Sequence, residues 1–327
     1  MKVLLCGDLA AAEFGAWHTA LAAACPEVQW LDSAAARADP EAVQAAVVAN
    51  PTPGSLRDFP NLALIQSLWA GVDRLMADPT LPAGVPLARM VDPAMTAAMA
   101  ETALWAVLSL HRGFFAYQRR QREGTWRVHA QRRAGEVGVL VLGQGEMGRA
   151  ALARIAALGY RAVGWRRDGT PLAAVLPQAD ILVNLLPLTP ATRGLLDARC
   201  FDALPRGASV VNLGRGAHVV EADLLAALGE TDDLDSADGA SDEAGAHRVD
   251  AAAPGRTGHL RHALLDVFQT EPLPAGHAFW IHPQVTMLPH AAALTDPRSA
   301  AAVAAANLRA LRDGRPLQHL VQPQRGY

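Results

Sequence analysis

Three glycines in the middle of the chain have the spacing needed to bind a phosphate group. They lie in Gly143-Gln-Gly-Glu-Met-Gly148, which directly follows the apolar run VGVLVL and opens a helical segment. Gly143 permits a tight turn, Gly145 lets the backbone approach a pyrophosphate, and Gly148 lets helix and strand pack closely. The helix dipole and the amides of Glu146 and Met147 favour an anion. This order predicts a dinucleotide site; the alternative is a glycine turn that binds no ligand.

The end of the next predicted strand, Arg161–Trp165, bears on which nicotinamide cofactor would fit. NAD sites commonly have an acid about 20 residues after the glycines, where it accepts hydrogen bonds from the ribose. Arg166 and Arg167 stand here instead, and two guanidiniums can hold a 2′-phosphate. Asp168 follows directly, so NADH remains an alternative, and a solvated arginine pair is another. We predict NADPH as the cofactor, in contact with Arg166 and Arg167.

Charged side chains follow further β-like runs in the second half of the chain. Arg215 comes after the run ASVV, Glu271 lies in DVFQTEPLP after the run ALL, and His290 lies just beyond Val285-Thr-Met. Ligands of open α/β sheets bind beyond the carboxyl ends of the strands, so we expect these side chains to face one site. Any one of them alone is more often an ordinary core or surface residue. The ordered set predicts a reactive site.

These motifs, in this order, resemble the D-isomer-specific 2-hydroxyacid dehydrogenase family, and most of all its short NADPH-linked glyoxylate/hydroxypyruvate reductase branch. The shared parts are LWAGVD at 68–73, the glycine motif, LPLTPATRGLL at 186–196, NLGRG, DVFQTEPLP and HPQVTMLPH. The resemblance covers nearly the whole chain. It implies an α/β fold of two doubly wound parallel-sheet domains with a cleft between them. A Rossmann NAD(P)-binding domain at 99–291 would be inserted into a flavodoxin-like substrate-binding domain at 1–98 plus 292–327.

The same resemblance implies roles for single residues. Arg215 matches the family's substrate-binding arginine, Glu271 the acid that orients the catalytic histidine, and His290 that histidine. Chemistry agrees, because reduction of a 2-keto acid needs a proton donor, and a neighbouring carboxylate raises the pKa of an imidazole. A guanidinium keeps its proton, so it can polarise the carbonyl. Other matched positions contact the substrate carboxylate (Trp69, Ala70 and Gly71) or the cofactor (Leu186, Pro187 and Asp266).

Short apolar runs alternate with helical segments along the whole chain, which indicates parallel sheets with crossover helices. An unbroken stretch from Met95 to Arg120 predicts one long amphipathic helix, and 147–158 and Ser299–Arg312 predict two more. The predicted strands are residues 2–6, 28–31, 45–48, 64–68, 137–142, 161–165, 181–186, 210–213, 264–268 and 286–288.

Composition argues against several classes of protein. The 327 residues are 51% hydrophobic and 19% charged, with a formal net charge of −3. This balance gives no strong field for nucleic acid or an anionic membrane, and no apolar run reaches the roughly 18 residues that a membrane-spanning helix needs. Three widely spaced cysteines suit a reducing compartment, and no cysteine pair has metal-ligand spacing. We expect a cytoplasmic enzyme without a metal, and the resemblance implies a homodimer.

The segment Glu230–Gly258 departs from the family pattern. It holds eight acids against two arginines and has almost no apolar periodicity. The family passes within a few residues from a segment like DLLAALG to one like GHLRHALLDVF, whereas nearly thirty residues intervene here. We predict an acidic surface loop, with an acidic interaction segment as the alternative.

Three functions are compatible with these motifs. The leading one is NADPH-dependent reduction of glyoxylate or hydroxypyruvate, with the proton supplied by His290. A second is a dehydrogenase of the same class that uses another keto acid or NADH. A third is a nucleotide-sensing protein, because a fold does not fix a function. The presence of Arg215, Glu271 and His290 together argues against the third.

Overall fold

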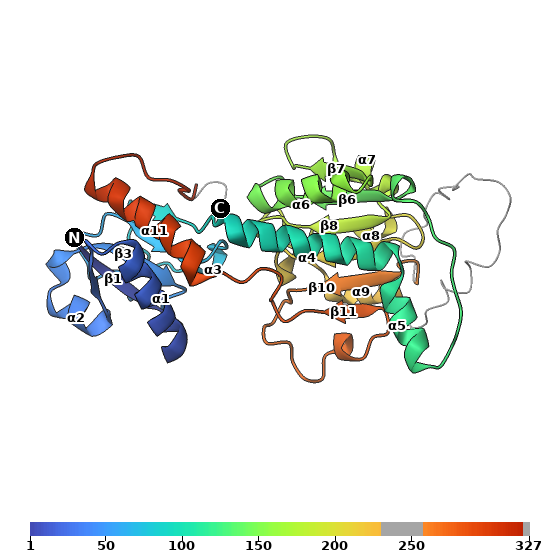
Figure 1. Ribbon diagram of the computed structural model, residues 1–327, viewed down its shortest axis with the longest axis horizontal. Helices are drawn as coiled ribbons and strands as arrows, with labels where there is room; N and C mark the ends of the chain where they lie inside the picture. Colours follow the sequence, from blue (N-terminus) through green and yellow to red (C-terminus); the bar gives the residue numbers. More distant parts are fainter. Residues whose placement is uncertain (230–257, 323–327) are drawn as a thin grey trace. The chain divides into compact units, whose positions relative to one another are not determined.

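The computed structural model describes residues 1–229 and 258–322 of the chain, in which helices and strands alternate (Figure 1). The chain divides into two units. The first is made of Met1–Thr96 and Leu294–Tyr327, and the second of Ala97–Ala293. The second unit is therefore an insertion into the first. The acidic loop predicted at 230–258 lies outside the described residues, except for Gly258.

The first unit is built on a five-stranded sheet in which every neighbouring pair of strands is parallel. The strand order is β2-β1-β3-β4-β5, which is the flavodoxin-like order. Strands buried on both faces of a sheet read as continuous apolar runs, which is why the sequence predicts most of them. The strands are β1 (Lys2–Gly7), β2 (Gln29–Leu31), β3 (Val43–Ala49), β4 (Ile65–Ser67) and β5 (Leu87–Ala88).

Two helices from opposite ends of the chain pack against each other in this unit (Figure 1). Trp17 and Leu21 of α1 share a buried core with Ala304 and Leu308 of α11. The last helix therefore completes a core that the first strands begin. The helices of this unit are α1 (Ala11–Ala24), α2 (Ser33–Ala38), the 3-10 helix η1 (Pro40–Ala42), α3 (Asp73–Met76) and α11 (Pro297–Arg312).

The second unit contains a six-stranded parallel sheet with the order β11-β10-β9-β8-β6-β7. From β6 the chain goes to β7 on one side and then to β8 on the other side. The order reverses at β6, and ligands of open α/β sheets bind at such a point. The strands are β6 (Gly138–Leu142), β7 (Arg161–Trp165), β8 (Ile181–Asn184), β9 (Ser209–Asn212), β10 (His262–Leu265) and β11 (Val285–Met287).

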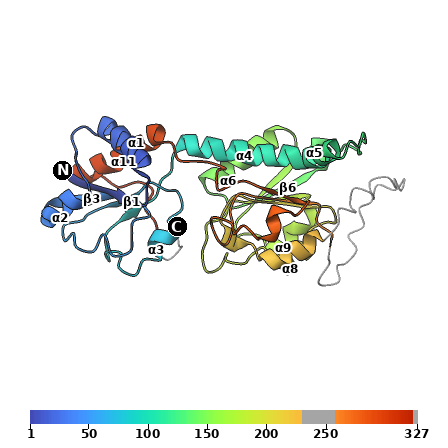
Figure 2. The same cartoon turned by 90° about the horizontal axis from the view of Figure 1, so that it is seen from below.

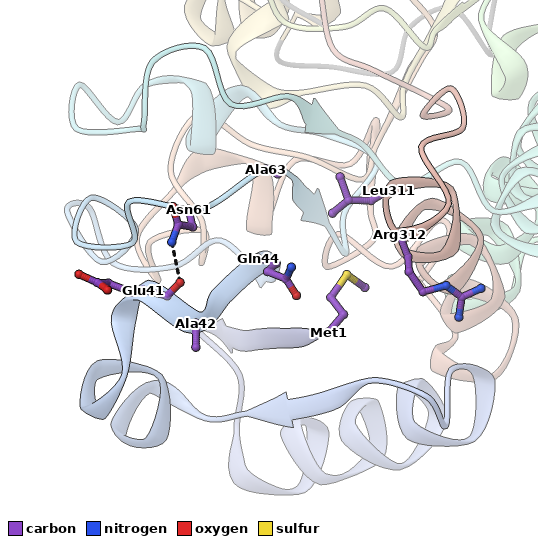
Figure 3. A pocket seen from close by; sticks show the side chains of 8 residues that line it. All are labelled: Met1, Glu41, Ala42, Gln44, Asn61, Ala63, Leu311 and Arg312. Atoms are coloured by element: carbon purple, nitrogen blue, oxygen red, sulfur yellow. Dashed lines mark hydrogen bonds between the residues drawn. The ribbon is translucent and has the colours of Figure 1, made fainter.

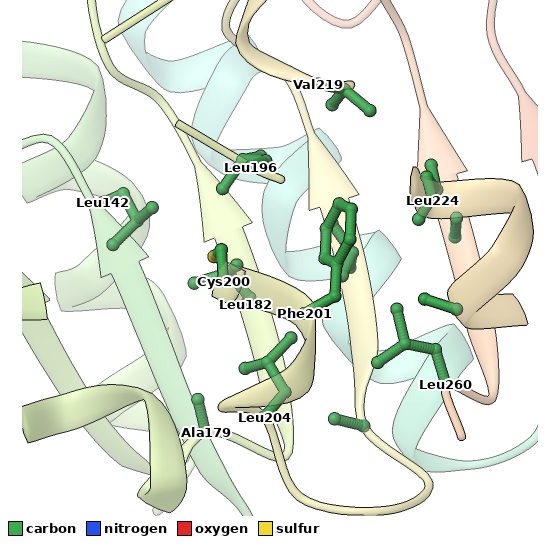
Figure 4. Close-up of a cluster of buried hydrophobic side chains, with 14 of the residues drawn as sticks. Leu142, Ala179, Leu182, Leu196, Cys200, Phe201, Leu204, Val219, Leu224 and Leu260 are labelled. Atoms are coloured by element: carbon green, nitrogen blue, oxygen red, sulfur yellow. The ribbon is translucent and has the colours of Figure 1, made fainter. Parts of the chain in front are cut away.

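Side chains of this sheet alternate between two cores, as the period of a strand requires. Val139 and Val141 face the core that contains residues of α4 and α6, whereas Leu140 and Leu142 face a core around Phe201 of α8 (Figure 4). Figure 2 shows α4 and α6 on one side of β6, with α8 and α9 on the other. The helices are α4 (Pro93–His111), α5 (Phe114–Arg122), η2 (Ala134–Glu136), α6 (Glu146–Ala157), α7 (Leu172–Val175), η3 (Leu176–Gln178), α8 (Ala198–Asp202), η4 (Gly216–His218), α9 (Glu221–Leu228) and η5 (Ala278–Trp280).

The single helix predicted from Met95 to Arg120 is wrong, because the structure has two helices, α4 and α5, in its place. Gly113 between them has a φ of +69°, and a Cβ at this position would overlap the ring of His129. A left-handed glycine of this kind ends a helix. Nor is α4 amphipathic, since Trp105 stays 42% exposed on an otherwise largely apolar helix.

In the described ranges, α4 is the one helix that is long and apolar enough to cross a membrane, judged by length and composition alone. Core helices pass the same test. Ala100, Ala103 and Val107 of α4 are fully buried against the second sheet. Their burial accounts for the apolar character of one part of α4 by packing inside the protein.

Candidate active site

All six strands of the second sheet end next to residues that the sequence predicts to bind or react. Because the strands are parallel, their carboxyl ends share one edge, which is the ligand-binding edge of such sheets. The structure therefore brings these predicted residues to one edge of the unit. They are Gly143–Gly148 after β6, Arg166 and Arg167 after β7, Leu186 and Pro187 after β8, Arg215 after β9, Asp266 after β10 and His290 after β11.

His290 and Glu271 form a hydrogen-bonded pair at this edge. Nδ1 of His290 lies 2.7 Å from Oε2 of Glu271, and the other carboxylate oxygen accepts the amide N–H of Phe268 at 2.9 Å. The hydrogen bond to Glu271 raises the pKa of His290 even though burial opposes it. At Glu271 burial acts to raise the pKa, but the hydrogen bonds from His290 and Phe268 outweigh burial, so the pKa of Glu271 is lowered. Each partner of the pair therefore favours the charged form of the other.

The backbone at His290 is held in the left-handed region, with a φ of +55°. Asp266 fixes this turn: its backbone oxygen accepts the His290 amide N–H at 2.8 Å. One carboxylate oxygen accepts the amides of Ala291 at 2.7 Å and Ala292 at 3.1 Å. Burial raises the pKa of Asp266, against the effect of these hydrogen bonds. A strained residue at a functional site needs such support, and no local sequence pattern predicts that Asp266 supplies it.

Arg215 stands beside this pair. Its positive charge acts to lower the pKa values of both Glu271 and His290, and one of its guanidinium nitrogens donates to Gly214 O at 2.8 Å. The next residue, Gly216, has no space for a side chain, because a Cβ there would overlap the carbonyl of Phe268. This close approach joins the loop of Arg215 to the loop that carries Glu271.

The glycine turn fits a pyrophosphate. Gly143 has a φ of +95°, and a Cβ on Gly148 would overlap Gly143 O, so the turn packs directly on the helix. A Cβ on Gly145, in contrast, would meet nothing within 4 Å. Open space therefore lies before the first turn of α6, whose amides have no partner within the helix and can bind an anion. The Glu146 carboxylate pairs with Arg149 of the same helix, which leaves the Glu146 amide for a ligand.

Asp168 is the partner of Arg166 at the end of β7. The Arg166 Nε lies 3.3 Å from a carboxylate oxygen of Asp168, and both side chains are more than two-thirds exposed. Exposed ion pairs contribute only about 0–1 kcal/mol. The pair is therefore weak enough for Arg166 to accept a phosphate as a further partner. Within residues 1–229 and 258–322, Arg167 has no ion-pair partner.

The loop Trp69-Ala70-Gly71 follows β4 in the first unit. The Trp69 N–H donates to Ser67 Oγ at 3.0 Å, its carbonyl accepts the Met90 N–H at 3.0 Å, and its ring meets Trp17 edge-on at 6.2 Å. The Trp69 amide is therefore already used. The amides of Ala70 and Gly71 have no partner in the part of the chain that the structure describes, and these two can bind an anion.

Three buried polar residues beside Arg215 were not predicted from the sequence: Asn184, Asn212 and His218. An asparagine that directly follows the apolar residues of a strand, as in ILVN and SVVN, is a signal that could have found the first two. His218 lies in a short 3-10 helix and has no such signal.

A pocket of about 560 Å³ lies elsewhere, in the first unit (Figure 3). Met1 precedes β1 and Ala42 precedes β3, so the pocket opens at the amino ends of these strands. No residue predicted for the site lines it. Within the described ranges, no group of three or more His, Cys, Asp or Glu side chains could hold a metal ion.

Comparisons with known proteins give a consistent result. The model of the D-isomer specific 2-hydroxyacid dehydrogenase NAD binding domain matches residues 104–235 and 252–292. The glyoxylate/hydroxypyruvate reductase A of Serratia proteamaculans is 36% identical over 299 residues, which cover 86% of this chain and 87% of that protein. That of Yersinia enterocolitica is 33% identical over 308 residues, covering 89% and 90%.

Solved structures are also similar. A D-isomer specific 2-hydroxyacid dehydrogenase from Xanthobacter autotrophicus, in complex with NADPH and MES, has a TM-score of 0.85 and 36% identity, covering 100% of this chain and 99% of that chain. An NADPH-dependent glyoxylate/hydroxypyruvate reductase from Sinorhizobium meliloti, in complex with NADP and sulfate, has a TM-score of 0.83 and 32% identity, with the same coverage.

Proposed function

Because this chain belongs to the D-isomer-specific 2-hydroxyacid dehydrogenase family, we propose that it reduces a small 2-keto acid, glyoxylate or hydroxypyruvate, with NADPH. The observation that carries this proposal is the hydrogen-bonded pair of His290 and Glu271 next to Arg215. The names of its relatives support the substrate class, and two similar structures are complexes with NADPH or NADP.

We propose the following residues as the cofactor site. The amides at the start of α6, at Glu146, Met147 and Gly148, hold the pyrophosphate, and the turn at Gly143 and Gly145 lets it approach. Arg166 and Arg167 bind the 2′-phosphate, whereas Leu186, Pro187 and Asp266 lie near the nicotinamide. When bound, NADPH supplies the hydride that reduces the keto carbon.

His290 supplies the proton in this mechanism. Its Nδ1–H donates to Glu271, so the proton on Nε2 is the one available for transfer. As the keto oxygen gains negative charge, the Nε2–H bond breaks and an O–H bond forms, which leaves a neutral imidazole. Glu271 favours the protonated ring before the transfer and fixes its orientation. In the reverse reaction the neutral ring accepts the proton of the hydroxy acid.

We propose Arg215 as one substrate-binding residue and, separately, the loop Trp69-Ala70-Gly71 as a substrate-binding loop of the first unit. The Arg215 guanidinium stays protonated throughout, so it polarises the carbonyl and holds the carboxylate. In the loop Trp69-Ala70-Gly71, the two amides without a partner, those of Ala70 and Gly71, bind the carboxylate, while the Trp69 ring limits substrate size. The unit of Met1–Thr96 and Leu294–Tyr327 would thus bind the keto acid, and the unit of Ala97–Ala293 the cofactor.

We also propose that the enzyme is a cytoplasmic homodimer without nucleic-acid or membrane partners. All three cysteines are free and buried, as suits a reducing compartment. The second unit exposes large apolar side chains at Trp105, Phe114 and Trp126, and exposed apolar patches often mark interfaces. The molar mass in solution tests the dimer: a wild-type monomer would contradict it, and Trp105→Glu should shift a dimer toward monomer.

Steady-state rates with a panel of keto acids test the function. Glyoxylate, hydroxypyruvate and pyruvate would each be combined with NADPH and with NADH, and the loss of dihydronicotinamide absorbance followed. We expect the highest kcat/KM for glyoxylate or hydroxypyruvate with NADPH. NADPH binding without turnover of any keto acid would contradict the proposal and would favour a sensing role.

A further inference from the structure

A buried polar cluster joins the ends of two neighbouring strands beneath Arg215. Asn184 ends β8 and Asn212 ends β9, and the two are directly opposite in register. His218 lies on η4, three residues after Arg215. All three side chains are 0% exposed. Polar groups buried this deeply must satisfy one another, so their hydrogen bonds define one arrangement.

Asn184 uses both ends of its amide. Nδ2 donates one hydrogen to Asn212 Oδ1 and the other to His218 Nδ1, each at 2.9 Å. The oxygen Oδ1 accepts the Leu186 amide N–H at 3.2 Å. The asparagine therefore ties the loop after β8 to the side chain of His218.

The contacts of His218 fix where its ring proton lies. Nδ1 accepts from two N–H donors, Asn184 Nδ2 and the Arg215 amide at 3.1 Å, so it carries no hydrogen. The hydrogen is then on Nε2, which donates to Pro187 O at 3.2 Å. One neutral ring thus contacts the Arg215 backbone through one nitrogen and the loop of Pro187 through the other.

The backbone of Arg215 is held on both sides by these residues. Its N–H donates to His218 Nδ1, and its carbonyl accepts Asn212 Nδ2 at 3.0 Å and the His218 amide at 3.1 Å. The guanidinium of an arginine can be placed reproducibly only if its backbone is fixed. The Pro187 carbonyl is less dependent on the ring, because Thr192 Oγ1 also donates to it at 2.8 Å.

We infer that His218 is a positioning residue that couples the cofactor loop at Leu186 and Pro187 to the substrate arginine, Arg215. Its Nδ1 sets the position of Arg215 and thereby the rate of turnover. Its Nε2–H holds the loop of Pro187 and thereby contributes to NADPH affinity. This inference rests on the proposed function, because it adds a residue to that site.

Two conservative substitutions separate the two nitrogens. His218→Asn places an amide oxygen near the position of Nδ1, which still accepts the Arg215 N–H, but removes the donor to Pro187. His218→Gln places an amide nitrogen near the position of Nε2, which still donates to Pro187, but removes the acceptor for Arg215. The matched control is His259→Asn, since His259 is equally buried in the same unit and its Nε2 pairs with Phe201 O at 2.9 Å, away from the site.

The variants should lose different properties. For His218→Gln we expect kcat with the keto acid to fall ~10-fold, since a buried amide loses its acceptor, while the Kd for NADPH stays within about twofold of wild type. For His218→Asn we expect the Kd and KM for NADPH to rise ~3-fold, because Pro187 O keeps Thr192 as a partner. His259→Asn should lower only the melting temperature.

The measurements are NADPH binding by fluorescence, steady-state kinetics and the melting temperature of each folded variant. Equal loss of the same parameters in both His218 variants would overturn the inference. So would a change in melting temperature alone, as in the His259 control. If wild-type protein binds NADPH but reduces no keto acid, the proposed function fails, and NADPH binding then decides this inference separately. Weaker NADPH binding by His218→Asn would support the role of His218 in holding the loop of Pro187. Unchanged NADPH binding by this variant would overturn it.

Discussion

The two halves of the second sheet carry different kinds of site residue. After β6 and β7 lie backbone amides with open space before them and two exposed arginines. After β9, β10 and β11 lie side chains whose positions depend on hydrogen-bonded partners: Arg215 on buried His218, and His290 on Glu271 and buried Asp266. A phosphate can be held by flexible or generic donors, whereas proton transfer needs a fixed geometry. Substitutions in the first half should therefore weaken cofactor binding, whereas substitutions in the second half should lower the rate of turnover or the stability of the protein.

The largest effect is expected for His290→Asn. Without the imidazole no group donates the proton, so kcat should fall ~10²–10⁴-fold, while NADPH binding stays close to wild type. Stopped-flow or steady-state kinetics measures the first value and fluorescence titration the second. A variant that keeps more than half of the wild-type kcat would rule out His290 as the proton donor.

Next in size is the effect of Glu271→Gln. The hydrogen bond from His290 to Glu271 raises the pKa of His290, so the protonated, donating form persists to higher pH. Loss of the carboxylate lowers the pKa of His290, and at neutral pH the rate of reduction should fall ~10²-fold. The high-pH limb of kcat/KM for reduction should move to lower pH.

The reverse reaction provides the control for this prediction, because oxidation of the hydroxy acid needs a neutral His290. Its low-pH limb should also move to lower pH in Glu271→Gln. If both limbs stay at their wild-type positions, the carboxylate does not control the titration of His290.

A pair of glycine substitutions compares the two halves directly. Gly145→Ala adds a methyl group to open space, so stability should change by less than about 1 kcal/mol, whereas NADPH affinity should fall ~30-fold through the lost approach of the phosphate. Gly216→Ala forces a methyl group onto the Phe268 carbonyl and should destabilise the protein by ~2–3 kcal/mol. Urea unfolding and NADPH titration of both variants measure these values. Equal destabilisation by Gly145→Ala and Gly216→Ala would contradict the expected difference between the two halves of the sheet.

The smallest effects concern the arginines after β7. Arg167→Ser should raise the KM for NADPH ~10-fold and leave the KM for NADH unchanged, because only NADPH carries the 2′-phosphate. Asp168→Asn frees Arg166 from its exposed partner and should lower the KM for NADPH about twofold. Parallel kinetics with both cofactors tests this. A loss of NADH activity equal to that of NADPH would show that Arg167 acts on the fold instead.

Most of the fold could be predicted because strands buried on both faces are continuous apolar runs. The structure confirmed the predicted α/β class and the parallel sheets. Three errors have physical causes. The apolar run at 181–186 extends beyond β8, which ends at Asn184, whose side chain belongs to the buried polar cluster. β5 is only two residues long, which is too short for any periodicity. The break at Gly113 depends on the packing of His129, which no local pattern reveals.

The candidate site could be predicted only where a motif is local in sequence. The glycine turn is such a motif, and Arg215 and His290 follow apolar runs that mark strand ends. The roles assigned to these residues stay predictions. His218 and the loop-holding contacts of Asp266 could not be predicted, because their partners lie at or just beyond the ends of other strands and are brought near only by the sheet register. Tertiary contacts of this kind produce no recognisable pattern of residue spacing in the sequence.

The shared core of α1 and α11 has a consequence for synthesis of the chain. The ribosome makes the whole second unit before it makes Pro297–Arg312, the helix that fills the core of the first unit. The inserted unit can therefore fold during translation, whereas the unit that begins the chain must wait for nearly the last residues. A chain that stops before residue 297 would release a finished inserted unit attached to an open apolar sheet, and quality control should remove it.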